Sequence, residues 1–369
     1  MKILYFYENN GSMMHMWQEF HIRDELLSHN IEVFFVNPLD FLSIKDANEY
    51  VVELIKVEKF NLFMTPHNEN KIYKETIKVI RDENIPTLLI CFDNLVIPFE
   101  HESVCAEFDL VWLTSWETEY LFKKWGAKTI FLPYAANPKL FNVNFSNLIN
   151  HICFVGTPYG SRANMINELA LNSINIDLYA NANANANANA NANANANANR
   201  INSAKNLLKT KYGRKIILGA LKQKISKQSD LNLSSRTLTL FKPVGLNELS
   251  SIYSKYTLSL SSTAARNTGV LKRPLNIVNL RSFEIPMSGG LQICKYNEEL
   301  ACYFKDNEDI IFYENDKEFI EKTKYYLLPE NKNIVLQMKK AARRNAEKNH
   351  TWFSRFKTIF DLLKVDYEP

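Results

Sequence analysis

The sequence has 369 residues, of which 46% are hydrophobic and 23% are charged. This composition excludes wholesale disorder, collagen and coiled coil, and the length predicts two domains. Lysine and arginine number 44 against 40 acidic residues, and the resulting net charge of +4 is too small to indicate nucleic-acid binding by itself. The five cysteines are widely spaced and form no CxxC pair, so neither a disulfide scaffold nor a zinc site is expected.

The first half of the chain alternates strand-like and helix-like segments. Short runs of consecutive apolar residues predict parallel strands that are buried on both faces. Helical periodicity between these runs predicts the helices that would cover such a sheet. The expected strands are 3–7, 31–36, 62–64, 87–92, 110–113 and 129–132, and the expected helices are 11–29, 46–57, 71–83 and a segment that ends at Trp125.

The same alternation restarts after a polar stretch at 137–150. We expect strands at 152–155, 174–179, 257–260, 291–294 and 310–313, and helices at 163–171, 246–253, 280–287 and 316–328. The pattern therefore predicts two doubly wound α/β domains in tandem, 1–145 and 146–345. A C-terminal helix within 346–369 is expected to pack back on the first domain.

Two unusual segments interrupt the second domain. The dipeptide Ala-Asn repeats ten times over 180–199 and offers no large apolar residue to bury. We interpret this tract as a flexible surface insert, with a self-pairing amide ladder as the alternative. Residues 200–228 hold nine basic residues and no acidic one. This segment is either a solvated helix packed on the second domain or a basic amphipathic helix lying on anionic lipid.

The expected location follows from the apolar patterning. No apolar run reaches the roughly 18 residues that a membrane-spanning helix needs. The apolar stretch from Ile3 to Tyr7 becomes polar at Glu8, which is too early for a signal peptide. We expect a cytoplasmic protein, which would be peripheral at the inner face of the membrane if 200–228 contacts lipid.

Ligands of open parallel sheets bind at the carboxyl ends of the strands, so the candidate residues are those that follow each strand. In the first domain the candidates are Asn10, Gly11, His15, His67, Asp93 and Asn94. In the second they are Gly156, Tyr159 and Arg162 in a glycine-containing loop, and Ser261, Ser262 and Thr263 after a later strand. For any one of them taken alone, an ordinary turn or cap is the alternative.

The most distinctive stretch, 276–290, reads NIVNLRSFEIPMSGG. Asn279 is a good N-cap for a short helix. Arg281 in the first turn opposes the helix dipole unless an anion binds there, and a phosphate would meet both free amides and this guanidinium. From Glu284, on a neighbouring part of the same face, a carboxylate could accept both hydroxyls of a ribose. The alternative is an ordinary capped helix with a surface Arg–Glu pair.

Other fingerprints are absent from the sequence. There is no GxGxxG, no GxxxxGK[ST], no HExxH and no GxSxG, and the seven histidines are scattered. The sequence therefore predicts neither a metal site nor a cofactor.

These segments resemble a known family. The run from Asn279 to Glu284, continued by Gly289 and Gly290, looks like the signature of CgeB-like glycosyltransferases, which are group 1 glycosyl transferases of the GT-B fold. The segments 92–94, 132–138, 152–162, 246–253 and 350–355 are similar to further parts of that family. The resemblance covers about 85–180 and 240–365.

The resemblance implies two Rossmann-like domains facing across a cleft, without a metal ion. The second would bind a nucleotide-diphosphate-sugar as substrate, and the first an acceptor in a surface polysaccharide, lipid-linked glycan or glycoprotein. The implied donor-binding residues are Asn276, Asn279, Leu280, Arg281, Ser282, Glu284, Gly156, Tyr159 and Arg162. The acceptor-side residues are Asn10, Gly11 and Asn94, and the base of an inverting reaction would be Asp93, His15 or His67.

One departure from the family pattern bears on the reaction type. Related retaining enzymes use an E-x7-E motif, and Glu284 fills its second position while Asn276 stands at the first. The retaining or inverting outcome, the donor and the acceptor therefore stay open. A nucleotide-sugar epimerase on the same fold and a catalytically silent nucleotide- or sugar-binding protein are the alternatives.

Overall fold

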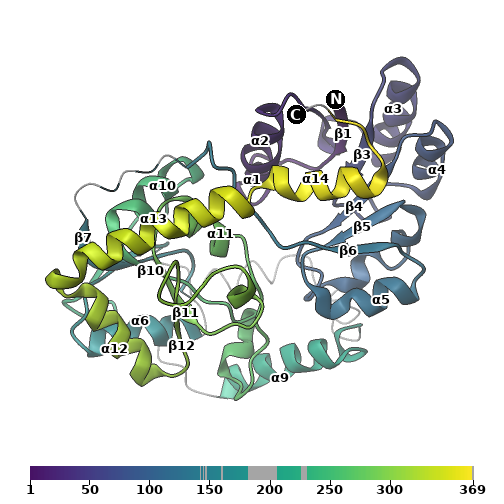
Figure 1. Ribbon diagram of the computed structural model, residues 1–369. Helices are drawn as coiled ribbons and strands as arrows, with labels where there is room; N and C mark the ends of the chain where they lie inside the picture. The colour runs from purple at the N-terminus through teal and green to yellow at the C-terminus, as the bar shows by residue number, and fades with distance from the viewer. Residues whose placement is uncertain are drawn as a thin grey trace. The chain divides into compact units, whose positions relative to one another are not determined.

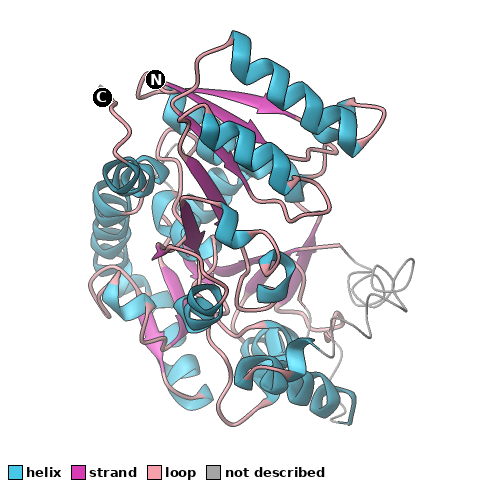
Figure 2. Cartoon of the chain, turned by 90° about the vertical axis from the view of Figure 1, so that its right-hand side faces the viewer, coloured by secondary structure: helices cyan, strands magenta, loops and turns pink. Residues whose placement is uncertain are grey.

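The computed structural model describes residues 1–141, 143, 145, 148–158, 161–181, 206–225 and 231–367. The chain forms two compact units. Unit 1 comprises Met1–Asn137 and His350–Pro369, and unit 2 comprises Pro138–Asn349. Each unit contains one six-stranded sheet whose strands are all parallel, with helices packed beside it (Figures 1 and 2). The predicted α/β fold class is confirmed.

The sheet of unit 1 has the strand order β2-β1-β3-β4-β5-β6. Every residue of β3, β4 and β5 is buried, which is why these strands read as continuous apolar runs. The order reverses between β1 and β3, so the loops after these two strands diverge to opposite faces. The strands are β1 (Lys2–Phe6), β2 (Glu32–Val36), β3 (Leu62–Thr65), β4 (Thr87–Cys91), β5 (Leu110–Leu113) and β6 (Thr129–Phe131).

The helices of unit 1 follow the expected rhythm with one difference. The single helix expected at 11–29 consists of α1 (Met13–Gln18), the π-helical segment η1 (Glu19–Arg23) and α2 (Asp24–Leu27). The remaining helices are α3 (Ile44–Val57), α4 (Lys74–Asp82), α5 (Glu119–Lys124) and α14 (Trp352–Leu363).

The C-terminal helix α14 is fastened within unit 1 by hydrogen bonds to its first turn. The buried carboxylate of Glu25 accepts from the backbone amides of Trp352 and Phe353, both at 3.0 Å. Arg355 donates to the carbonyl oxygens of Pro133 at 3.1 Å and Tyr134 at 3.2 Å. The segments 132–138 and 350–355, which both resemble the family, therefore contact each other. This contact is a structural reason for the resemblance in both segments.

The sheet of unit 2 has the order β12-β11-β10-β7-β8-β9, which reverses between β7 and β10. Its strands are β7 (Ile149–Val155), β8 (Ile176–Tyr179), β9 (Leu238–Phe241), β10 (Tyr256–Leu260), β11 (Gln292–Lys295) and β12 (Ile311–Tyr313). Within the described residues, its α-helices with given bounds are α6 (Ser161–Leu171), α9 (Lys211–Ile225), α10 (Leu246–Lys255), α11 (Arg281–Met287), α12 (Asp316–Leu327) and α13 (Lys332–Asn349). Apolar side chains of α6 and α12 share one core cluster with the strands.

Three features of unit 2 differ from the sequence-based expectations or lie beyond them. Edge strand β9 was not predicted, although its four residues pair in register with β8. Within the basic segment 200–228, α9 is helical and packs against the short helix η6 (Arg266–Val270). All but the first two residues of the Ala-Asn tract lie outside the described residues. No helix in the described ranges has the length and apolar character to cross a bilayer.

Candidate functional site

The strand order places one candidate site at the carboxyl ends of β7 and β10 in unit 2. Gly156 directly follows β7 and has a φ of +124°. A Cβ atom built on this glycine would lie 2.8 Å from Nη2 of Arg281, the first residue of α11. The backbone after β7 and the guanidinium therefore approach each other more closely than any residue with a side chain would allow.

Arg281 and Glu284 share a neighbour that the sequence analysis did not select. The hydroxyl of Tyr253 in α10 is hydrogen-bonded to Arg281, and Glu284 lies close enough to act on it electrostatically. Tyr253 is 1% exposed, and burial raises the pKa of its hydroxyl. A neutral phenol thus orients the guanidinium that faces Gly156, and no sequence motif marks this tyrosine.

Several buried polar atoms beside Arg281 have no hydrogen-bond partner within the described residues. They are Oγ of Ser261, Oδ1 of Asn279 and Oγ of Ser282. Such atoms are rare in folded proteins because each costs free energy unless water, an ion or a ligand satisfies it. Three of them, after β10 and around the start of α11, make this part of unit 2 a candidate site for a polar ligand.

The prediction that Asn279 caps the short helix is wrong. The residue at the N-cap is Leu280, in helical conformation and without a side-chain cap. The Asn279 side chain turns instead to the loop after β10, where its Nδ2 donates to the carbonyl oxygen of Ser262 at 3.2 Å. It therefore ties the motif to the loop that lines the neighbouring cavity.

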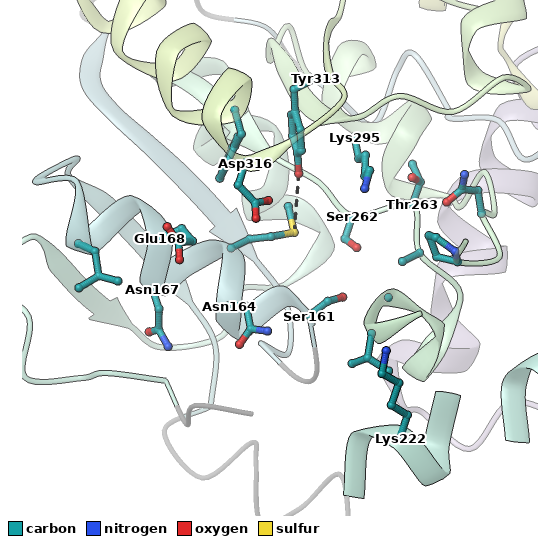
Figure 3. Close-up of a pocket in the computed structure, with 18 residues that line it drawn as sticks. Ser161, Asn164, Asn167, Glu168, Lys222, Ser262, Thr263, Lys295, Tyr313 and Asp316 are labelled. Carbon is teal, nitrogen blue, oxygen red and sulfur yellow. Dashed lines mark hydrogen bonds between the residues drawn. The ribbon is translucent and has the colours of Figure 1, made fainter. Parts of the chain in front are cut away.

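A cavity of about 600 Å³ lies at the same edge of the sheet. The residues after three adjacent strands line it: Ser262 and Thr263 after β10, Lys295 at the end of β11 and Tyr313 at the end of β12. Figure 3 shows Ser262, Lys295 and Tyr313 around one common space, with the Tyr313 hydroxyl donating to Sδ of Met165 at 3.9 Å.

The remaining wall of the cavity combines apolar side chains with polar groups of both signs of charge. Asn276, at the first position of the motif, lines it and forms an antiparallel bridge with Ala264. Glu168 and Asp316 supply carboxylates, and Lys222 of α9 supplies a second ammonium group in addition to that of Lys295. The site offers hydrogen bonds to a polyhydroxylated ligand and cations to an anionic one.

In the predicted loop 156–162, the structure describes residues 156–158, 161 and 162. Arg162 lies in the first turn of α6, and its Nη1 donates to the carbonyl oxygen of Thr157 at 3.3 Å. Tyr159 lies outside the described residues.

In unit 1, two of the predicted histidines accept hydrogen bonds from the loop after β1. Nε2 of His67 accepts from the backbone amide of Glu8 at 2.8 Å, and the Glu8 carboxylate pairs with Lys71 at 2.6 Å. Burial lowers the pKa of His67 to about 4, so the ring is neutral at pH 7. Nδ1 of His15 accepts from the backbone amide of Asn10 at 3.2 Å, which leaves Nε2 of a neutral ring as the donor.

Asp93 follows β4 and has a left-handed φ of +56°. Tyr134 donates its hydroxyl to Oδ1 of Asp93 at 3.4 Å, and burial raises the pKa of this tyrosine. The ring of Tyr134 stacks on Phe92 with centroids 5.8 Å apart. The carboxylate therefore stands beside an aromatic cluster at the carboxyl edge of the sheet.

The structure corrects the assignment of Asn94 to the acceptor side. Its side chain is 1% exposed and joins the end of β4 to the segment after β5. Nδ2 donates to the carbonyl oxygen of Ser115 and to Thr118, both at 2.6 Å, and Oδ1 accepts from the amides of Thr114 and Ser115. Because these hydrogen bonds occupy both ends of its side-chain amide, Asn94 stabilises the connection between the two segments and does not face an acceptor.

The other acceptor-side candidates, Asn10 and Gly11, are exposed in the loop after β1. Gly11 lines a second cavity of about 420 Å³ in unit 1. Its further lining includes Asn9 and Asn37, which exchange hydrogen bonds, and the carboxylates of Glu19 and Asp40. Within the described residues, no group of three or more His, Cys, Asp and Glu side chains is placed to hold a metal ion.

Comparison with known proteins gives the site its context. Residues 221–361 match the family described as glycosyl transferase-like, and the matched range includes α11 with Arg281 and Glu284. The chain carries a glycosyl transferase-like domain. None of the curated proteins matches the chain in sequence.

Solved structures of low sequence identity share the fold over nearly the whole chain. HepE of Anabaena, in complex with UDP and glucose, is 12% identical over 99% of both chains, with a TM-score of 0.55. A glycosyltransferase from Rickettsia africae is 11% identical over 98% of this chain and 97% of the other, with a TM-score of 0.56. Sucrose-phosphate synthase from Thermosynechococcus elongatus is 11% identical over 98% of both chains, with a TM-score of 0.50.

Fold and family match together confirm the resemblance seen in the sequence, and the chain is a glycosyltransferase of the GT-B type. In this glycosyltransferase, the structure brings together Gly156, Arg281 and Glu284 among the predicted donor residues. It adds Tyr253 and Lys295, which the sequence analysis missed. Lys295 was predictable as the last residue of a strand, whereas Tyr253 lies inside a helix and gives no such signal.

Proposed function

We propose that this glycosyltransferase moves a sugar from a UDP-sugar to a hydroxyl group of a surface polysaccharide, a lipid-linked glycan or a glycoprotein. The observation that carries the proposal is the approach of Gly156 to the Arg281 guanidinium beside the cavity of about 600 Å³. Uridine is the base to test first, because HepE shares the fold and has been solved with UDP-glucose.

The diphosphate of the donor would lie between Gly156 and Arg281. A glycine there lets the backbone reach the phosphates, and a guanidinium binds phosphate oxygens through charge-assisted hydrogen bonds. Arg162 and the backbone of Asn279 and Leu280 complete this subsite. Because α11 has only seven residues, the guanidinium contributes more of the positive charge than the helix dipole.

The nucleoside and the sugar would occupy the two sides of this diphosphate subsite. Glu284, which is 6% exposed, would accept hydrogen bonds from the ribose hydroxyls. Oγ of Ser282 and Oδ1 of Asn279, which have no hydrogen-bond partner in the part of the chain that the structure describes, would gain partners from the donor. Asn276 would contact the sugar hydroxyls through its amide, in the place where related retaining enzymes have a carboxylate.

In the transfer, the bond between the anomeric carbon and the diphosphate oxygen breaks and the acceptor oxygen bonds to the anomeric carbon. The acceptor proton passes to a base or, in a retaining reaction, to the leaving diphosphate. Arg281 would stabilise the negative charge that grows on UDP, and this protein cation is the reason to expect a reaction without a metal ion. Activity that persists in a chelator would support this expectation.

If the reaction inverts configuration, Asp93 is the best candidate for the base. A carboxylate accepts a proton without a change of tautomer. His15 comes second, because its Nδ1 already accepts from Asn10. His67 comes third, because Nε2 is engaged with Glu8 and its pKa is only about 4. The configuration of the product, read by NMR, decides whether any of them is needed.

Isothermal titration of the full chain with UDP, GDP and ADP tests the donor site. We expect UDP to bind, and Arg281→Ala to weaken binding by roughly 10- to 150-fold, the equivalent of about 1.5–3 kcal/mol for hydrogen bonds to a charged group. Arg344→Ala, at an exposed arginine of α13, is the matched control and should bind as the parent does. Unchanged affinity in Arg281→Ala would reject the proposed diphosphate subsite.

A further inference from the structure

Helix α9 presents two faces of different character. One face packs against η6 and contains the buried residues Gly213, Ile216 and Gly219. A Cβ atom on Gly213 would lie 2.0 Å from the carbonyl oxygen of Leu207, so this side of the helix has no room for a larger residue. This packing determines which face of α9 is left in solvent.

The solvent face combines large apolar side chains with cations. Leu218, Leu221 and Ile225 follow one another at helical spacing and are 55%, 54% and 83% exposed. Within the described residues, no carboxylate forms an ion pair with the basic side chains of this face. Six residues make up this face, which we call the α9 face: Lys211, Arg214, Leu218, Leu221, Lys222 and Ile225.

We propose that the α9 face docks on an anionic lipid bilayer. Three apolar side chains would enter the interfacial region, while the long stems of the basic residues lie along them and carry their charges to the lipid phosphates. The absence of any acidic residue in 200–228 removes a source of repulsion. A polyanion such as RNA would satisfy the cations but would leave the leucines in water, so lipid accounts for both parts of the face.

Binding of the α9 face to lipid does not depend on the donor site. What it implies for the acceptor rests on the proposed function. Lys222 belongs to the α9 face and also lines the cavity proposed for the donor. A docked α9 would therefore hold the donor-binding unit close to the lipid surface, where a lipid-linked acceptor lies. The acceptor class favoured by this surface is a glycan anchored in the membrane.

Co-sedimentation of the full chain with vesicles tests the proposal. The probes are vesicles of phosphatidylcholine alone and of phosphatidylcholine with phosphatidylglycerol. We expect binding to the anionic vesicles and little to the neutral ones. Lys211→Gln with Arg214→Gln should weaken partitioning roughly 25-fold, at about fivefold for each cation near a charged surface. Lys222 stays unchanged in this variant because it lines the donor cavity.

A second variant tests the apolar half of the face. Leu218→Ser, Leu221→Ser and Ile225→Ser together should also abolish sedimentation with anionic vesicles. Leu42→Ser with Val57→Ser is the matched control, since these residues of unit 1 are 102% and 81% exposed and lie elsewhere. Chemical denaturation shows that every variant is folded, and UDP titration tests the donor site separately, so that a failed donor proposal and a failed docking proposal can be told apart.

Two results would overturn the proposal. The first is a parent protein that sediments with neither kind of vesicle, or equally with both. The second is an apolar variant that still binds anionic vesicles as the parent does, because charge alone would then explain binding and the face would be a general polyanion site. Loss of binding in both variants and its retention in the control supports lipid docking.

Discussion

Replacing Gly156 by alanine tests the donor site at its tightest point. Gly156 has a φ of +124°, where an L-residue is strained by roughly 1–3 kcal/mol. The new Cβ would also lie 2.8 Å from Nη2 and 3.6 Å from Cζ of Arg281. The flexible guanidinium would move away, and the hydrogen bonds that it offers a diphosphate would be lost. We expect the affinity for UDP to fall roughly 10- to 150-fold.

The assay separates this effect from backbone strain. UDP affinity is measured by calorimetry well below the unfolding temperature, and the free energy of unfolding by chemical denaturation. Gly126→Ala is the matched control, because Gly126 has a φ of +91° and its Cβ would meet only Ala106 at 3.6 Å. It should lose stability but keep its UDP affinity.

A double variant adds a second test. If Gly156→Ala acts through Arg281, it should weaken UDP binding little further in an Arg281→Ala background. The reasoning is refuted if Gly156→Ala lowers stability as Gly126→Ala does and leaves UDP affinity unchanged.

Three further substitutions test separate parts of the structure. Glu284→Gln should weaken UDP binding about tenfold and binding of 2′-deoxy-UDP much less, since the carboxylate would accept the ribose hydroxyls; equal losses in calorimetry would contradict the role. Tyr253→Phe should weaken UDP binding about 2- to 10-fold, and little further in an Arg281→Ala background, whereas Tyr325→Phe, at an exposed tyrosine of α12, is the control and should bind UDP as the parent does. Burial raises the pKa of Glu25 to about 7 from 4.5, so its folded state binds the proton more tightly. Stability from this group is therefore fully present below pH 4.5 and is lost, by up to about 3 kcal/mol, as pH rises to about 7. Glu25→Gln should remove this part of the pH dependence in chemical denaturation, and parallel curves would contradict it.

Much of the fold could be predicted from the sequence because buried parallel strands have a strong local signature. The runs 87–92 and 110–113 are apolar at nearly every position, and β4 and β5 are buried throughout. Edge strand β9 was missed because it is partly exposed and polar residues surround it. Its partner is β8, from which the Ala-Asn tract and α9 separate it in sequence.

The motif around Arg281 and Glu284 was also readable from the sequence, since residue types and spacing recur in the family. The local geometry of the motif was not readable from the sequence. Asn279 has the side chain of an N-cap, but the tertiary structure turns it to Ser262, seventeen positions away. Asn94 follows a strand as a ligand-binding residue would, yet it fills its hydrogen bonds with the segment after β5.

The sequence by itself determined most of the strands and helices and the residues proposed for the donor site. Only the tertiary structure decided that Gly156 faces Arg281 and that Tyr253 holds the guanidinium. Local patterns report burial and helix periodicity, which depend on neighbours in the chain. The approach of a glycine to an arginine more than a hundred residues away depends on strand order, and strand order is set by the packing of the whole sheet.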